Sequence, residues 1–355
     1  MDRRRFLGSL AGVAGAAAVG VVVGPFVSGC GAKKGGRAGA GGAGAGGAGA
    51  GGAGAGGTGA ASGTGSASGP AAATGVRPGA KVAGDIVVCA GNDPYAQTLK
   101  AIEALGGIDL FVKKGDRVVL TPNLAFARTP EQGANTHPRV LRAVIDACLK
   151  AGAARITVLD YVLDAAAVAF KVNGAEEAVQ GTGARLISPQ DERQYQKVDV
   201  SRLAMHAKHG VEQAVAHEVL KANALISIPV IKDHEAGVMS GALKKVMGVI
   251  WERRGYHRAD LHACIAEINT IVRPTLIVAD ATRVLQTRGP KGPGELTKPN
   301  HVLAAVNPVL VDAYACRYLR KDGELKVAAV PHIGHAAKLL GVPSLEGPKV
   351  LEVTA

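Results

Sequence analysis

Short apolar runs alternate with amphipathic segments from about residue 77 onward, and this alternation limits the fold more than any other feature of the 355-residue chain. In the segment 138–151, apolar residues recur with the spacing of one helix face, and Gly152 ends the pattern. The expected strands are residues 85–89, 117–121, 155–159, 185–188, 224–228, 275–279, 301–306 and 349–353. The expected helices are residues 94–105, 138–151, 165–180, 211–222, 260–271 and 308–319, with another inside 241–249. Strands separated by helices form βαβ units, so the sequence predicts an α/β fold with a mainly parallel sheet flanked by helices.

Residues 1–30 have the composition of a targeting segment, with a charged start and an Ala/Gly/Val-rich apolar run. Arg3 and Arg4, followed by Phe6-Leu7, resemble the twin-arginine export signal, and Val27-Ser-Gly-Cys30 resembles a lipobox. We therefore expect export through the twin-arginine machinery to the cell envelope, with Cys30 acylated and the protein held at the membrane. A cleaved signal without a lipid and an uncleaved membrane anchor are the alternatives.

Residues 31–76 consist almost entirely of Gly, Ala, Ser and Thr, with a repeated Gly-Ala-Gly-Gly pattern. Such a segment has no large apolar side chain to bury, so we expect a disordered linker that tethers the following domain. The sequence thus predicts three parts: a signal over 1–30, a linker over 31–76 and an α/β domain over 77–355.

Charge and cysteine spacing exclude several classes of function. The chain has 41 Lys and Arg against 29 Asp and Glu, and part of this excess lies in the signal and linker. With only 3% aromatic residues, a nucleic-acid interface is not expected, whereas a basic cleft for an anionic small molecule is. The cysteines are far apart and form no Cys-x-x-Cys pair, so no iron–sulfur cluster is expected in this chain. A divalent metal remains the cofactor that the other residues allow.

Polar residues follow several of the expected strands, at Asn123, Asp160, Lys232 with His234, and Asp280. The carboxyl ends of parallel strands share one edge of a sheet, where ligands bind in open α/β folds. These residues are therefore predicted to line one cleft.

The segment 229–234, Pro-Val-Ile-Lys-Asp-His, carries the strongest candidates for chemistry. Lys232, together with Lys244 from the following Gly/Lys-rich segment, is suited to hold an anionic group. His234 could act as an acid, a base or a metal ligand. The alternative is a solvated basic loop. Of Lys244 and Lys245, we expect one in the cleft and one in solvent.

A second group of candidates opens the helix at Pro138. Asn135 or Thr136 is expected to cap this helix, while Thr136 and His137 are candidate ligand-binding residues, with His137 a second candidate metal ligand beside His234. Asn123 and Asp280 would orient or complete the site. Of His257 and His262, we expect one in the cleft. The loop 289–294 is interpreted either as a cover over the cleft or as a plain surface loop.

Several blocks of the folded part match one family in order: residues 115–123, 133–138, 151–153 with 157–160, 228–234 with 241–244, and 279–280 with 289–292. They resemble the DUF362 family of uncharacterised prokaryotic proteins. The resemblance implies an α/β domain with a Lys-x-His loop and no established reaction. Some members of the family carry a ferredoxin-like domain with two [4Fe–4S] clusters, from which this chain departs because it lacks the cysteines. A looser similarity in fold links these features to the lactate racemase group.

The leading hypothesis is an exported protein that binds an anionic small molecule, with or without a metal, and that is an enzyme of unknown reaction class. The competing hypothesis is a non-catalytic binding or accessory lipoprotein that serves a membrane redox complex, with a separate redox partner.

Overall fold

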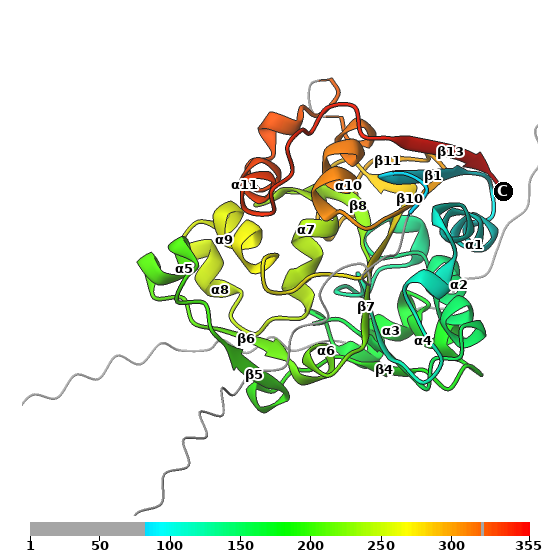
Figure 1. Ribbon diagram of the computed structural model, residues 1–355, viewed down its shortest axis with the longest axis horizontal. Coiled ribbons are helices and arrows are strands. Elements are labelled where there is room, and N and C mark those ends of the chain that lie inside the picture. The colour runs from blue at the N-terminus through cyan, green and yellow to red at the C-terminus, as the bar shows by residue number, and fades with distance from the viewer. Residues whose placement is uncertain (1–81, 321–322) are drawn as a thin grey trace, which may run out of the picture. The chain divides into compact units, whose positions relative to one another are not determined.

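The computed structural model describes residues 82–320 and 323–355 (Figure 1). The predicted signal with Arg3, Arg4 and Cys30, and the predicted linker over 31–76, lie outside the described residues. No helix in the described part of the chain is long and apolar enough to cross a membrane.

A large mixed sheet forms the centre of the described part, in the strand order β13-β1-β12-β10-β7-β2-β3-β4. These strands are β1 (Ile86–Ala90), β2 (Arg117–Pro122), β3 (Arg155–Leu159), β4 (Arg185–Ile187), β7 (Ala224–Ile228), β10 (Leu276–Leu285), β12 (His301–Ala305) and β13 (Val350–Thr354). β10, β7, β2, β3 and β4 run parallel, β12 runs antiparallel to both of its neighbours, and β13 pairs parallel with β1. The predicted α/β fold with a mainly parallel sheet is therefore confirmed.

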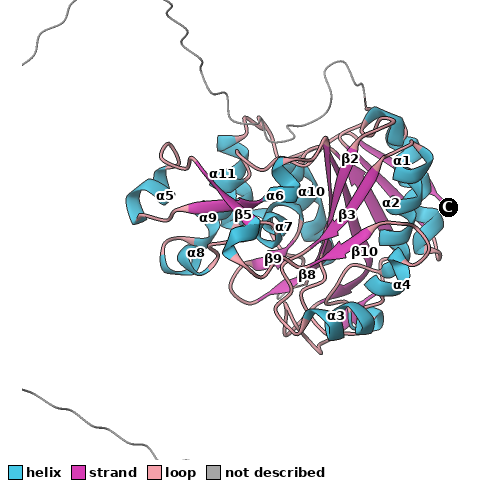
Figure 2. Cartoon of the chain, turned by 90° about the horizontal axis from the view of Figure 1, so that it is seen from below, coloured by secondary structure: helices cyan, strands magenta, loops and turns pink. Residues whose placement is uncertain are grey.

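Helices cover both faces of this sheet (Figures 1 and 2). α1 (Pro94–Leu105), α2 (Pro138–Lys150) and α4 (Ala175–Val179) lie on one side, with α3 (Ala166–Val172) beside them. The other side carries α7 (Ala242–Lys245), α9 (Leu261–Ile268), α10 (Pro308–Ala315) and α11 (Pro331–Leu339). The short helices α5 (Ala204–His209), α6 (His217–Leu220) and α8 (Arg254–Arg258) complete the described helices.

The strands are apolar in succession because both of their faces are buried. In β1, Ile86 and Val88 pack into the core that contains α9 and α10, while Val87 and Cys89 pack into the core beneath α1 and α2. Successive side chains of a strand point to opposite faces, so a continuous apolar run supplies two cores at once.

The segment 229–234 is a strand and not the loop that the sequence predicts. β8 (Val230–His234) pairs parallel with β10 and antiparallel with β9 (Val238–Ser240). β10 also continues past the predicted end at residue 279 to Leu285, where it pairs with β11 (Leu296–Thr297). Pairing with strands distant in sequence extends both elements, so Asp280 lies within a strand and not at its end.

The helix predicted over 211–222 is also wrong. Its first half is strand β6 (Gln213–Ala216), which pairs antiparallel with β5 (Tyr195–Val198), and only the four residues of α6 are helical. The apolar spacing suited a helix, but the pairing with β5 determines the structure of this segment.

Candidate functional site

A cavity of about 600 Å³ opens beside the carboxyl ends of β2 and β3, next to β8 and α7. Its lining is Asn123, Ala125, Phe126, Asp160, Tyr161, Leu163, Lys232, His234, Ser240, Lys244, Lys245, Met247, Gly248, Trp251, Glu252, Arg253, Arg254, His257 and Pro290. The structure thus brings Lys232, His234, Lys244 and Asn123 to one cavity. The lining contains more basic than acidic side chains, which makes the cavity suited to an anion.

Lys232 is buried in β8, with 2% of its surface exposed. Its ammonium group donates hydrogen bonds to the backbone oxygens of Ala134 and Pro290, and it lies 5.1 Å from the centre of the Phe126 ring. Burial, and then the charge of Lys244, lower the pKa of Lys232 to about 7. The lysine is therefore held by dipoles and a ring face, with a proton that it can lose near neutral pH.

Lys245 has a full counter-charge, since its ammonium lies 2.8 Å from the carboxylate of Asp160 and both side chains are buried. The other Asp160 oxygen accepts a hydrogen bond from the backbone N–H of Leu124. A Cβ atom at Gly248 would come within 2.1 Å of Asp160 and 2.3 Å of Lys245, so the close approach of this backbone requires glycine. The expectation that one of Lys244 and Lys245 is solvated is therefore wrong, because both line the cavity.

Lys244 is partly buried and has a weaker set of contacts than its neighbour. Its ammonium group lies 3.7 Å from the sulfur of Met247. Burial, followed by the charge of Lys245, lowers the pKa of Lys244 to about 8. This ammonium is left with little to stabilise its charge.

His234 is fixed in orientation by the turn that follows β8. The backbone N–H of Gly237 donates to its Nδ1 at 3.1 Å. Burial, and then the charges of Lys244 and Lys232, lower the pKa of His234 to about 2. A neutral imidazole whose Nδ1 accepts must carry its proton on Nε2, so this histidine is a hydrogen-bond donor through Nε2.

Asn123, at the end of β2, joins two elements of the site. Its side-chain oxygen accepts from the backbone N–H of Val230, and its backbone N–H donates to the hydroxyl of Thr136. That hydroxyl donates in turn to the carbonyl of Ile228 at 2.6 Å. Asn123 lines the cavity, whereas Thr136 does not. The hydroxyl of Thr136 joins the 134–137 segment to the end of β7.

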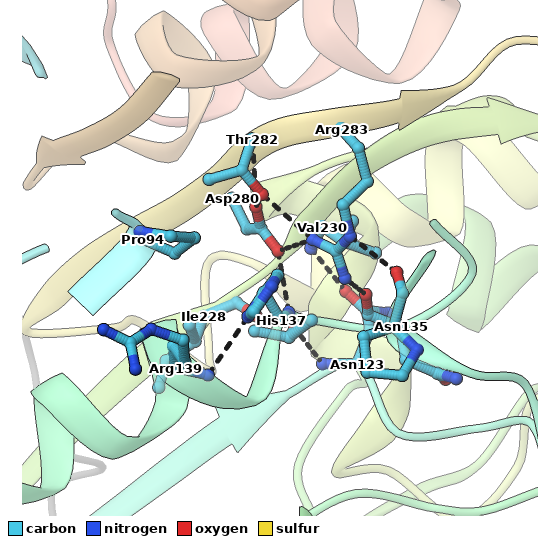
Figure 3. Close-up of polar contacts among 12 residues, drawn as sticks. Pro94, Asn123, Asn135, His137, Arg139, Ile228, Val230, Asp280, Thr282 and Arg283 are labelled. Atoms are coloured by element: carbon cyan, nitrogen blue, oxygen red, sulfur yellow. Dashed lines mark hydrogen bonds and ion pairs between the residues drawn. The ribbon is translucent and has the colours of Figure 1, made fainter. Parts of the chain in front are cut away.

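Asp280 belongs to a separate buried cluster that does not line the cavity (Figure 3). Its carboxylate pairs with Arg283 and accepts from the N–H and hydroxyl of Thr282 and from the N–H of His137. Burial alone would raise the pKa of Asp280, but Arg283 and Thr282 lower it. With these partners, the side chain holds the start of α2 in place.

His137 caps α2, in place of the predicted Asn135 or Thr136. Its Nδ1 accepts from the backbone N–H of Arg139 at 3.1 Å, and its backbone N–H donates to the carboxylate of Asp280 (Figure 3). The side chain of Asn135 instead bonds the loop before it, at Phe126 and Arg128. The capping bond itself is local, and Asp280, 143 positions away, binds the backbone N–H of the capping residue.

The predicted metal ligands His137 and His234 thus lie in different hydrogen-bonded groups. Within the described residues there is no group of three or more His, Cys, Asp and Glu side chains that could hold a metal ion. Of the other two candidate histidines, His257 lines the cavity, while His262 forms a hydrogen bond with His332 and stacks on its ring.

The loop 289–294 contributes Pro290 to the cavity wall, and two polar contacts hold it in place. The carbonyl of Pro290 accepts from Lys232, and the ammonium of Lys291 pairs with Asp164 at 2.8 Å. A Cβ atom at Gly289 would lie 1.8 Å from the backbone oxygen of Asp233, so the loop packs directly on β8. The loop is a wall of the site and not a plain surface loop.

Sequence reasoning missed the segment 251–254 and the rings of Phe126 and Tyr161. The signal was present, because Trp251-Glu-Arg-Arg254 places the only tryptophan of the chain two positions before a pair of arginines, shortly after the Gly/Lys-rich segment. Arg253 lies over the ring of Tyr161, with 3.1 Å between the guanidinium carbon and the ring centre.

Comparisons with known proteins give a family and partial similarities. The family model described as "Domain of unknown function (DUF362)" matches residues 118–317. A thylakoid-associated protein of Synechocystis sp. is 24% identical over 197 residues, which cover 53% of this chain and 59% of that protein. The lactate racemase apoprotein of Thermoanaerobacterium thermosaccharolyticum has a TM-score of 0.42 at 13% identity, covering 67% of this chain and 57% of that chain. A Thermotoga maritima protein has a TM-score of 0.38 at 15% identity, covering 58% and 55%. The chain therefore spans less than two thirds of each of these proteins.

Proposed function

Because this chain belongs to the DUF362 family, whose description assigns no activity, we propose a function from its cavity: it binds a small anionic molecule there. The charge would be held by Lys232 and Lys244, with His234 donating a hydrogen bond from Nε2. Asn123 would position β8 beneath the ligand through Val230.

One observation carries this proposal. Three lysines line the cavity, and in the described part of the chain Lys245 is the one among these three that is paired with a carboxylate. The ammonium groups of Lys232 and Lys244 bond backbone oxygens and a thioether instead. Burying a charge without a counter-charge is unfavourable, so a bound anion would stabilise both groups.

The same geometry supports acid–base chemistry on the ligand. A lysine whose pKa is near 7 can both donate and accept a proton at neutral pH, and shifts of this size gather at functional sites. We therefore propose Lys232 as the group that exchanges a proton, if the bound anion reacts.

We further propose that the protein is exported by the twin-arginine route and anchored at the cell envelope through Cys30. The Arg3-Arg4 pair, the apolar run and the Val27–Cys30 segment support this proposal.

The anion-binding proposal is tested by titrating the full-length protein with acetate, malonate and inorganic phosphate in a calorimeter. Lys244→Met should abolish binding of whichever anion binds, while its melting temperature without ligand stays within a few degrees of the parent. Lys338→Met, which removes an exposed lysine of α11, is the matched control and should bind as the parent does. Unchanged affinity in Lys244→Met would contradict the proposal.

A further inference from the structure

The cavity has an apolar and aromatic part that an inorganic anion would not use. Phe126, Tyr161 and Trp251 all line it, although Phe, Tyr and Trp make up only 3% of the chain and Trp251 is the only tryptophan. Leu163 and Met247 extend the same apolar lining. This concentration of rings indicates that the cavity recognises more than charge.

Contacts with neighbours hold two of these rings, those of Tyr161 and Trp251, in place. The rings of Tyr161 and Trp251 meet edge to face with 6.4 Å between their centres, and Trp251 also packs on Tyr195 at 5.3 Å. Arg253 covers one face of Tyr161. Rings held in this way provide a preformed apolar surface, which costs a ligand little ordering entropy.

The aromatic surface lies beside the ammonium groups of two lysines. The ammonium group of Lys232 is 5.1 Å from the centre of the Phe126 ring, and that of Lys291 is 5.8 Å from it. An anionic group bound at Lys232 would therefore bring any ring attached to it close to Phe126.

Leu163 adds an apolar group that water surrounds in the free protein. It lines the cavity, yet 63% of its surface is exposed. Covering such a side chain with a ligand would be favourable, since it removes apolar surface from water. Inorganic phosphate would leave Leu163 exposed and would make no use of the apolar part of the cavity lining.

We propose that the anion bound here carries an aromatic body, and thus that the ligand class is aryl carboxylates or aryl phosphates rather than inorganic or short aliphatic anions. The anionic group would lie at Lys232 and Lys244, and the ring against Phe126, Tyr161 and Leu163. This inference rests on the proposed anion-binding function and narrows it.

The test compares phenyl phosphate with methyl phosphate, which carry the same charge and differ in the apolar body. Full-length protein is titrated with each by calorimetry, and Trp251 emission excited at about 295 nm provides a second signal that only the cavity reports. We expect phenyl phosphate to bind at least about tenfold more tightly and to change the emission of Trp251, since stacking of the ring and burial of its apolar surface both favour the larger ligand.

Two cavity variants and one control variant separate the aromatic contact from general stability. Leu163→Ser should weaken phenyl phosphate binding several-fold and leave methyl phosphate binding unchanged. Leu339→Ser, at a leucine of α11 that is 50% exposed, is the matched control and should change neither. Phe126→Leu should reduce the preference for the ring while keeping an apolar side chain beside Lys232.

The outcomes distinguish this inference from the function on which it rests. Equal affinity for the two phosphates would overturn the aromatic preference and leave the anion-binding function standing. Failure of both phosphates and of benzoate to bind would refute the anion-binding function and the inference together. Benzyl alcohol binding as tightly as phenyl phosphate would show an apolar site without a role for the lysines, and would also refute both.

Discussion

Lys232 should make anion binding depend on pH in the neutral range. Its pKa is lowered to about 7, so the site gains a positive charge as pH falls through 7 and loses it as pH rises. We expect affinity for a fixed-charge anion such as methanesulfonate to fall between pH 6 and 9. Lys244, whose pKa is lowered to about 8, adds to this fall in the upper part of the range, whereas His234, with a pKa of about 2, stays neutral throughout. Calorimetric titration across this range provides the measurement, and a flat profile would contradict the assignment of the charge to these two lysines.

The lowered pKa of Lys232 also changes how the stability of the fold depends on pH. Between pH 7 and the ordinary lysine pKa of about 10.4, the unfolded chain holds a proton on Lys232 that the folded chain has released, so this residue makes stability rise with pH over that window. The destabilising effect of its buried charge is fully present below pH 7.

The Lys245–Asp160 pair is expected to be a structural ion pair within the site. Lys245→Met leaves a buried carboxylate with one backbone donor, which should cost about 3–5 kcal/mol in the free energy of unfolding. Adding Asp160→Asn removes the unpaired charge and should recover a large part of this loss. Urea unfolding of both variants measures the difference, with Lys244→Met as a control that leaves the pair intact. A loss below about 1 kcal/mol for Lys245→Met would show that the pair is dispensable.

At the scale of the elements, the loop 289–294 positions the ligand site by packing on β8. Gly289→Ala would force a Cβ atom to within 1.8 Å of the Asp233 carbonyl, so the loop must move and the bond between Lys232 and Pro290 must break. We expect anion affinity to fall at least about tenfold, together with a lower melting temperature. Gly334→Ala in α11, where a Cβ atom meets nothing within 4 Å, should leave binding unchanged and can stabilise by about 0.5–1 kcal/mol. Normal binding in Gly289→Ala would show that the loop is not a wall of the site.

The elements that the sequence predicts well are those whose burial follows from their own pattern. β7 lies at residues 224–228 as expected, and α2 begins at Pro138 as expected, because each combines an apolar pattern with a local start or stop signal. β8 and the second half of β10 exist because of partners distant in sequence, and no local pattern reveals those pairings.

The same distinction between local patterns and distant partners applies to the candidate site residues. Asn123 follows the parallel strand β2, Lys232 and His234 lie in β8, and Lys244 lies in α7, and these elements meet at one cavity. Asp280 and His137 bond each other instead, since β10 continues beyond Asp280 and carries Arg283 to it. Phe126 and Tyr161 come from segments after the strands, whose course depends on bonds to distant residues such as Asp164 and Gly248.

At the scale of the whole molecule, the proposed binding belongs to the described domain, whereas the proposed export and anchoring depend on residues 1–30. Arg3→Lys with Arg4→Lys should block export, because the twin-arginine machinery recognises the arginine pair and lysines keep only the charge. Fractionation of cells that express the full chain is expected to move the protein from the envelope to the cytoplasm, with anion binding retained in the purified variant. Cys30→Ser should leave export intact and release the protein from the membrane fraction, because acyl chains would provide the anchor. Envelope localisation of the double lysine variant would refute the twin-arginine route, and membrane retention of Cys30→Ser would indicate that the apolar run itself, and not a lipid, anchors the protein.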